Sequence, residues 1–164
     1  MNKRLAHSAS FARLFTHSNE IWRKAIVMAT ILLSAACSTP YQSASWMGGH
    51  TEKSLGGNAW EVTFQGNANR DRTFVMNAAM YRAAEISQRE GKDFFQVTLS
   101  STEVTDRAYV NFTNLVSYKA HLVMKVLQTS KEGCPQGQSV VCKVYGTGES
   151  LAYYGKLIGV SPPK

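Results

Sequence analysis

The chain has 164 residues, with 18 lysines and arginines against 11 acidic residues, and three cysteines. This length suits one domain with a leader or a tail and is too short for two independent cores. An apolar content of 44% and a charged content of 18% are typical of a globular chain and exclude disorder over the whole length. The net charge of +7 would suggest a nucleic-acid partner if the positive charges were clustered in the folded part.

The basic excess is concentrated in the first 24 residues. These carry Lys3, Arg4, Arg13, Arg23 and Lys24, with Glu20 as the single acid. An uncharged run, residues 25–36, follows. Twelve residues of helix rise about 18 Å, well short of the ~30 Å hydrocarbon core of a bilayer. A basic stretch, a short apolar run and small residues at its end are typical of a secretory signal, so we predict that residues 1–36 are a signal peptide.

Cysteine follows directly on the small residues that end this run, in the order Ser34, Ala35, Ala36, Cys37. The order resembles a bacterial lipobox, in which the cysteine becomes the first residue of the mature chain and receives lipid on its sulfur and its new amino group. One position departs from the usual pattern, because Ser34 stands where leucine is usual and Leu33 comes one place earlier. We predict lipidation of Cys37, with ordinary cleavage near Ala36 or an uncleaved anchor as the alternatives.

The predicted mature chain is nearly neutral. Removing the five basic residues and the one acid of the leader leaves 13 basic and 10 acidic residues, a net charge of +3. No block of five like charges remains, so no nucleic-acid partner is expected. We expect the membrane as a partner through the lipid, and an envelope protein as a further one. Because Ser38 is not the aspartate associated with inner-membrane retention, the predicted location is the periplasmic leaflet of the outer membrane.

Cys134 and Cys142 remain once the leader and Cys37 are set aside. An even pair in an oxidising compartment is most simply a disulfide. In the loop-entropy model a bridge over so short a loop stabilises the fold by roughly 2–3 kcal/mol. A redox pair is usually closer, as in Cys-x-x-Cys, and a zinc site needs more ligands than His50 and His121 can add. We therefore expect neither a metal nor a cofactor.

Residues 37–58 are rich in serine and glycine and show neither strand alternation nor helical spacing. This composition predicts a flexible tether, with a globular domain at 59–164. Within the tether, Trp46 and Met47 are interpreted as loosely packed, with contact to the lipid surface as the alternative. Apolar residues then alternate over residues 60–65, which predicts a half-buried strand.

A helix is predicted over residues 72–90, with Asp71 as its N-cap and Gly91 just past its end. Residues 93–100 predict a second strand with Phe95, Val97 and Leu99 facing inward. A strand, helix, strand order with short links predicts a right-handed crossover and parallel pairing of the two strands.

The second half of the domain shows weaker patterns. Residues 101–117 are expected to form an extended loop or a frayed strand extension. Residues 118–127 and 139–145 predict two strands, joined as an antiparallel hairpin around Cys134, and a short helix follows up to Gly159. The expected fold class is α+β: a single small domain whose mainly antiparallel sheet of about four strands carries one long helix on one face and a short C-terminal helix.

Three short motifs lie before, within and after the predicted long helix. They are Phe64-x-Gly66-Asn67, then Tyr81-Arg82-Ala83-Ala84-Glu85-Ile86, then Gly91-x-Asp93-x-Phe95. Together they resemble a family of small, uncharacterised lipoproteins of proteobacteria. The resemblance covers residues 58–100 well and residues 118–128 loosely, and the segment between Cys134 and Cys142 departs from it. It implies no activity, so it bears on class and location alone.

Arg82 is the residue of most interest, because it lies at the edge of the apolar stripe of the predicted helix. A charge there has to be paired or reach solvent, since unpaired burial costs several kcal/mol. We interpret it as a structural arginine bonded to strand-end carbonyls, Glu85 or Asp93. An anion-binding residue in a groove and a side chain that reaches along the surface to solvent are the alternatives. In the structural interpretation, Arg82→Ala is expected to cost about 1–3 kcal/mol.

Catalytic signatures are missing from the sequence. It contains no Gly-x-Ser-x-Gly motif, and nothing in the spacing of Glu61, Glu85 and Asp93 brings two carboxylates together as a glycosidase requires. We therefore expect no enzyme but a non-enzymatic binding, assembly or stress-related module of the envelope. An inhibitor or partner of an envelope enzyme that inserts the Cys134–Cys142 loop is the alternative, and a small cell-wall hydrolase is a weaker one.

Overall fold

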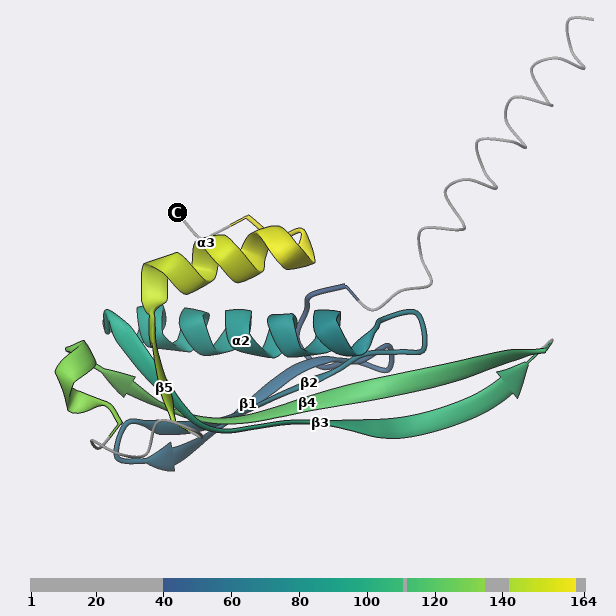
Figure 1. The fold of residues 1–164 in the computed structure, drawn as a ribbon, viewed down its shortest axis with the longest axis horizontal. Coiled ribbons are helices and arrows are strands. Elements are labelled where there is room, and N and C mark those ends of the chain that lie inside the picture. The colour runs from purple at the N-terminus through teal and green to yellow at the C-terminus, as the bar shows by residue number, and fades with distance from the viewer. Residues whose placement is uncertain (1–39, 111, 135–141, 162–164) are drawn as a thin grey trace, which may run out of the picture. The chain divides into compact units, whose positions relative to one another are not determined.

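The computed structural model describes residues 40–110, 112–134 and 142–161. In chain order its elements are β1 (Gly49–Gly56), β2 (Ala59–Gln65), α2 (Arg72–Arg89), β3 (Phe94–Val110), β4 (Thr113–Leu127), a 3-10 turn (Ser130–Glu132), β5 (Lys143–Gly146) and α3 (Thr147–Ile158). The five strands form one antiparallel sheet in the order β1-β2-β4-β3-β5. Helix α2 covers one face of this sheet and α3 packs on α2 (Figure 1). The predicted α+β single domain is confirmed, with five strands.

The best-predicted part of the fold is the unit β2–α2. Val62 and Phe64 point into the core from β2 and are fully buried. Asp71 caps α2 by accepting a hydrogen bond from the backbone N of Phe74 at 2.6 Å, which satisfies one of the free amide groups of the first turn. Gly91 has φ 65° and turns the chain out of the helix. Local capping and alternation were therefore sufficient to place these elements.

Small side chains bring the layers close together. The fully buried alanines of α2 are Ala78, Ala79, Ala83 and Ala84. They leave room for the larger core side chains of the sheet beneath, such as Phe95 and Leu122. On the α3 side, a Cβ at Gly155 would lie 2.8 Å from the carbonyl oxygen of Val160 and 3.0 Å from the ring of Tyr81. Glycine at this position therefore permits the contact between α3 and α2.

The predicted parallel pairing of the strands on either side of α2 is wrong. Strand β4 lies between them, so β2 and β3 run in the same direction but each pairs antiparallel with β4. The predicted hairpin of β4 with the last strand is also wrong, because β5 pairs with β3, for example Phe95 with Tyr145. In both cases the reason is the long β3–β4 hairpin, which places β4 beside β3 and leaves the far edge of β3 for β5.

Residues 101–117, expected as a loop or frayed extension, belong mostly to this hairpin. Strand β3 continues to Val110 and β4 begins at Thr113. The register slips by one residue between Val97 and Leu99, which places these two side chains on opposite faces of the sheet. As a result Leu99 is 45% exposed, and the prediction that it faces inward is wrong.

The predicted flexible tether is wrong for the residues just before β2. Residues 49–56 form the edge strand β1, which pairs with β2 along its length apart from a register shift between Ser54 and Gly56. Gly57 and Asn58, with φ 59° and 64°, make the tight turn between the two strands, as expected for a two-residue hairpin loop that favours glycine and asparagine. Tyr41 also packs against the core, so the fold reaches back well before residue 59.

The predicted disulfide is confirmed. The Cα atoms of Cys134 and Cys142 lie 5.7 Å apart, within the range for a bridge, and the two sulfurs are bonded. Residues 135–141 lie outside the described part of the chain. The bridge therefore connects the end of the 3-10 turn to the start of β5.

Replacing both bridge cysteines, Cys134→Ser with Cys142→Ser, is expected to lower the free energy of unfolding by about 2 kcal/mol and leave the domain folded. A separation of only eight residues closes a small loop, so the gain from constraining the unfolded chain is modest. Thermal unfolding with and without reductant measures it. The reductant should lower the midpoint of the native chain and leave the variant unchanged; identical midpoints for the two chains without reductant would contradict a stabilising bridge.

Candidate functional site

Arg82 lies between α2 and the edge strand β1 and contacts two carboxylates. Its Nε donates to Oε2 of Glu52 at 2.9 Å, and its Nη2 lies 2.9 Å from the same oxygen. Its Nη1 donates to Oε2 of Glu85 at 2.8 Å. All three side chains are about one-fifth exposed, at 21–22%. The guanidinium is thus bonded on both sides in a partly water-excluded place.

The contacts extend in both directions from Arg82. Arg89 donates from Nη1 to the other oxygen of Glu52 at 2.6 Å, and its guanidinium lies 4.9 Å from the centroid of the Trp60 ring. On the other side the hydroxyl of Tyr41 donates to Glu85. We call the set Tyr41, Glu52, Arg82, Glu85 and Arg89 the β1–α2 clamp. It ties the segment before β1, and β1 itself, to the long helix.

The charges of the clamp balance, with two guanidinium groups against two carboxylates. Burial works against the charged form of Arg82, but the hydrogen bond to Glu85 and the charge of Glu52 raise its pKa on balance. Burial likewise raises the pKa of Glu52, but the hydrogen bond from Arg89 and the charge of Arg82 outweigh it and lower the pKa overall. Burial, then the Glu85 contact, raises the pKa of Tyr41, which keeps its hydroxyl protonated as a donor. An added anion would find no unmatched positive charge here, so the geometry favours the structural interpretation of Arg82.

The structure brings only some of the predicted partners together. Glu85 contacts Arg82 as expected, whereas no contact joins Arg82 to Asp93, whose backbone oxygen instead accepts from the backbone N of Thr147 at 2.8 Å. Glu52 is the partner that sequence reasoning missed, because it lay in the segment assigned to the tether. The signal that could have found it is the Gly57-Asn58 pair, which is typical of a two-residue hairpin loop and would have placed residues 49–56 beside β2, with Glu52 opposite Val62.

Acid is expected to lower the melting temperature of the domain in two stages. Burial and then the charge of Arg82 lower the pKa of His50 from 6.5, so its contribution is complete above pH 6.5 and is lost as the pH falls through the lowered pKa. The lowered pKa of Glu52 adds a second loss, which begins below its ordinary value of 4.5.

Melting temperatures recorded between about pH 8 and pH 3 check this dependence. The variant His50→Gln should remove the first decline and Glu52→Gln the second. A melting temperature that stays level from about pH 8 to pH 3 would contradict the assignment of both groups, and one that stays level down to pH 4.5 would contradict that of His50.

The acidic residues considered for a hydrolase lie in separate places. Glu61 faces away from α2 and contacts Nε2 of His121 at 2.8 Å on the open face of the sheet. Glu85 lies on α2, on the other side of the sheet, and Asp93 is the last residue before β3. Among the described residues, no group of three or more His, Cys, Asp or Glu side chains is placed to hold a metal ion.

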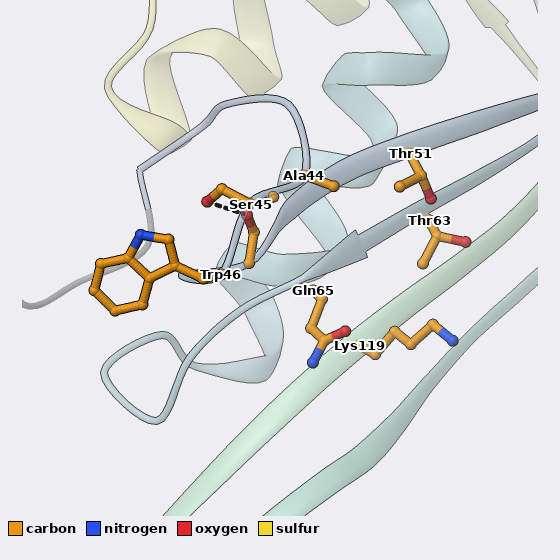
Figure 2. A pocket seen from close by; sticks show the side chains of 9 residues that line it. Ala44, Ser45, Trp46, Thr51, Thr63, Gln65 and Lys119 are labelled. Carbon is orange, nitrogen blue, oxygen red and sulfur yellow. Dashed lines mark hydrogen bonds between the residues drawn. The ribbon is translucent and has the colours of Figure 1, made fainter.

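A shallow hollow of about 310 Å³ lies where the chain turns into β1, over the open face of the sheet (Figure 2). Its lining residues are Ala44, Ser45, Trp46, Gly48, Gly49, Thr51, Thr63, Gln65 and Lys119. Hydroxyl, amide and ammonium groups line its floor, while the ring of Trp46 points away from it (Figure 2). The ammonium of Lys119 is 3.6 Å from Glu103, so its charge is already partly compensated. The hollow offers hydrogen bonds to a small polar group, without an activated nucleophile.

Cys37, the predicted lipidation site, lies outside the described residues. No helix in the described part of the chain is long and apolar enough to cross a membrane. In comparisons with known proteins, no family model, curated protein or solved structure matches the chain. The resemblance to proteobacterial lipoproteins therefore stays a prediction from the motifs around Gly66, Arg82 and Asp93.

Proposed function

We propose that the protein is a lipid-anchored protein of the bacterial envelope, whose domain works as a non-enzymatic binding or assembly module on the periplasmic side of the outer membrane. The observation that carries the proposal is the order of residues 25–37: an uncharged apolar run, small residues and then Cys37. This is the arrangement expected of a signal that ends in a lipidated cysteine.

Two features of the folded part support the proposal. The Cys134–Cys142 bridge suits an oxidising compartment such as the bacterial periplasm. The side chains of Arg82, Glu52 and Glu85, each about one-fifth exposed, are bonded to one another, and these contacts are expected to stabilise the fold. A binding module needs a stable scaffold of this kind, whereas a hydrolase of the glycosidase type would need two carboxylates facing one cleft.

The proposal predicts a covalent change at one residue. Protein purified from membranes of the producing bacterium should begin at Cys37 and carry acyl chains there, which N-terminal mass spectrometry measures. The variant Cys37→Ser should lack the acyl chains and leave the membrane fraction. Ser38→Ala serves as the matched control and should keep both. An intact leader, or a mature chain with an unmodified N-terminus, would overturn the proposal, and enrichment in the inner membrane would overturn the outer-membrane location.

A further inference from the structure

The most exposed large apolar side chains of the described chain are three aromatic residues. Trp46 is 94% exposed, Phe112 93% and Tyr109 66%. They come from two separate segments, the turn before β1 and the tip of the β3–β4 hairpin. Single exposed apolar residues are common on protein surfaces, but a set gathered at one end of a molecule indicates a contact surface.

Strand register places both segments at the same end of the sheet. Gly49, Gln65, Lys119 and Glu103 face one another in a single row across four strands. Trp46 lies in the turn just before the first member of this row. Beyond the row β3 and β4 continue without β2 or β5 as a two-stranded arm, residues 104–118, which Figure 1 shows extending past the rest of the sheet. At the rise of a strand, the arm reaches roughly 20 Å beyond the row.

The tip of the arm is suited to an apolar or interfacial environment. Residues 107–116 carry a single charge, on Arg107. Phe112 has φ 66°, in the left-handed region, and directly precedes β4, whose first residue Thr113 pairs with Val110. Glycine is favoured at such a position, and a bulky residue there costs on the order of 1 kcal/mol. The side chain of Phe112 is not buried within the fold, so no packing there offsets this conformational cost. We therefore infer a contact outside the chain.

The β1–α2 clamp limits the distance between the folded part and Cys37. Tyr41 is held by Glu85 and by the rings of Phe64 and Tyr81, so the folded part begins four residues after Cys37. Four residues span at most about 14 Å in any conformation. A lipid on Cys37 therefore keeps the start of the fold within that distance of the bilayer, in place of the long tether that the composition predicted.

We propose that this end of the domain rests on the lipid bilayer with the arm lying along its surface, which lets Trp46, Tyr109 and Phe112 all reach the interfacial region although the arm extends roughly 20 Å beyond the row next to Trp46. The inference rests on the proposed lipid anchor and adds an orientation to it. Tryptophan and tyrosine favour the headgroup level because their rings combine an apolar body with a polar atom, and phenylalanine adds apolar area beside them. The anchor and the aromatic side chains together then hold the domain in one orientation, with α3 away from the surface.

The test uses the full, processed protein reconstituted into vesicles of phosphatidylethanolamine and phosphatidylglycerol that contain a lipid brominated in its acyl chains. Bromine quenches tryptophan emission at short range. Trp60→Phe leaves Trp46 as the single tryptophan after removal of residues 1–36. Phe112→Trp, made with Trp46→Phe and Trp60→Phe, reports on the arm tip. Tyr153→Trp in the same background is the matched control, because Tyr153 is a 62% exposed aromatic residue on α3.

We expect loss of emission and a shift to shorter wavelength for the tryptophans at positions 46 and 112, and neither change at position 153. Equal quenching at all three positions, or none at 46 and 112, would overturn the inference. N-terminal mass spectrometry of the same samples distinguishes a wrong orientation of the domain from the absence of the lipid anchor. Acylated Cys37 without quenching leaves the proposed function standing, whereas an unmodified Cys37 overturns both. Circular dichroism melting checks that each variant is folded.

Discussion

Replacing Arg82 by alanine is expected to lower the free energy of unfolding by about 2–4 kcal/mol. The change removes a guanidinium that contacts two carboxylates, and it leaves Glu52 and Glu85, each about one-fifth exposed, without their shared counter-charge. The sequence alone predicted about 1–3 kcal/mol, for the loss of a charge-assisted hydrogen bond and its acceptors. Since the contacts join α2 to β1, chemical or thermal unfolding of the whole domain measures the loss.

Two further variants show whether the loss comes from the geometry of Arg82. Arg82→Lys should recover little, since one ammonium group cannot reproduce the planar fork that contacts Glu52 and Glu85 at the same time. Arg89→Ala is the matched control on the same helix; Arg89 is 44% exposed, so its contact with Glu52 is expected to contribute less. An unchanged unfolding midpoint for Arg82→Ala would refute the structural role of Arg82 and favour the alternative interpretation, an anion-binding residue.

Replacing Tyr41 by alanine is expected to cost a similar 2–4 kcal/mol. The ring lies parallel to Phe64, with centroids 6.2 Å apart, and edge-on to Tyr81 at 5.0 Å. Its loss opens a gap beside the core and removes the hydroxyl that donates to Glu85. The residues before β1 should then detach, and hydrogen exchange at the backbone amide of His50, which donates to the oxygen of Gln42 at 2.8 Å, should accelerate.

Tyr41→Phe separates the ring from the hydroxyl. This variant keeps the stacking and loses only the bond to Glu85, so a cost of about 1 kcal/mol is expected. Exchange at His50 should stay slow. If alanine and phenylalanine were equally harmless, the start of the folded part would lie after residue 41, and the short reach between Cys37 and the domain would no longer hold.

Short-range patterns determined much of the secondary structure. Asp71 and Gly91 bound α2, and Gly159, with φ 74°, ends α3. Alternation in residues 60–65 placed β2 with its apolar side inward. The even pair Cys134 and Cys142, in a chain predicted to be exported, predicted their bridge. Each of these features depends on residues that are close together in the chain, so the local sequence was enough to predict it.

The tertiary structure alone decided how these elements meet. Strand β1 is polar, with His50 and Glu52 facing the helix, so it shows none of the apolar alternation by which a strand is recognised. It forms because the turn at Gly57 and Asn58 brings it onto β2 and because Arg82 neutralises Glu52. The position of β4 between β2 and β3 follows in the same way from pairing between distant residues, which no local pattern reports. The partners of Arg82 depend on that pairing, because an ion pair between a helix and a strand exists only once the sheet has placed the strand.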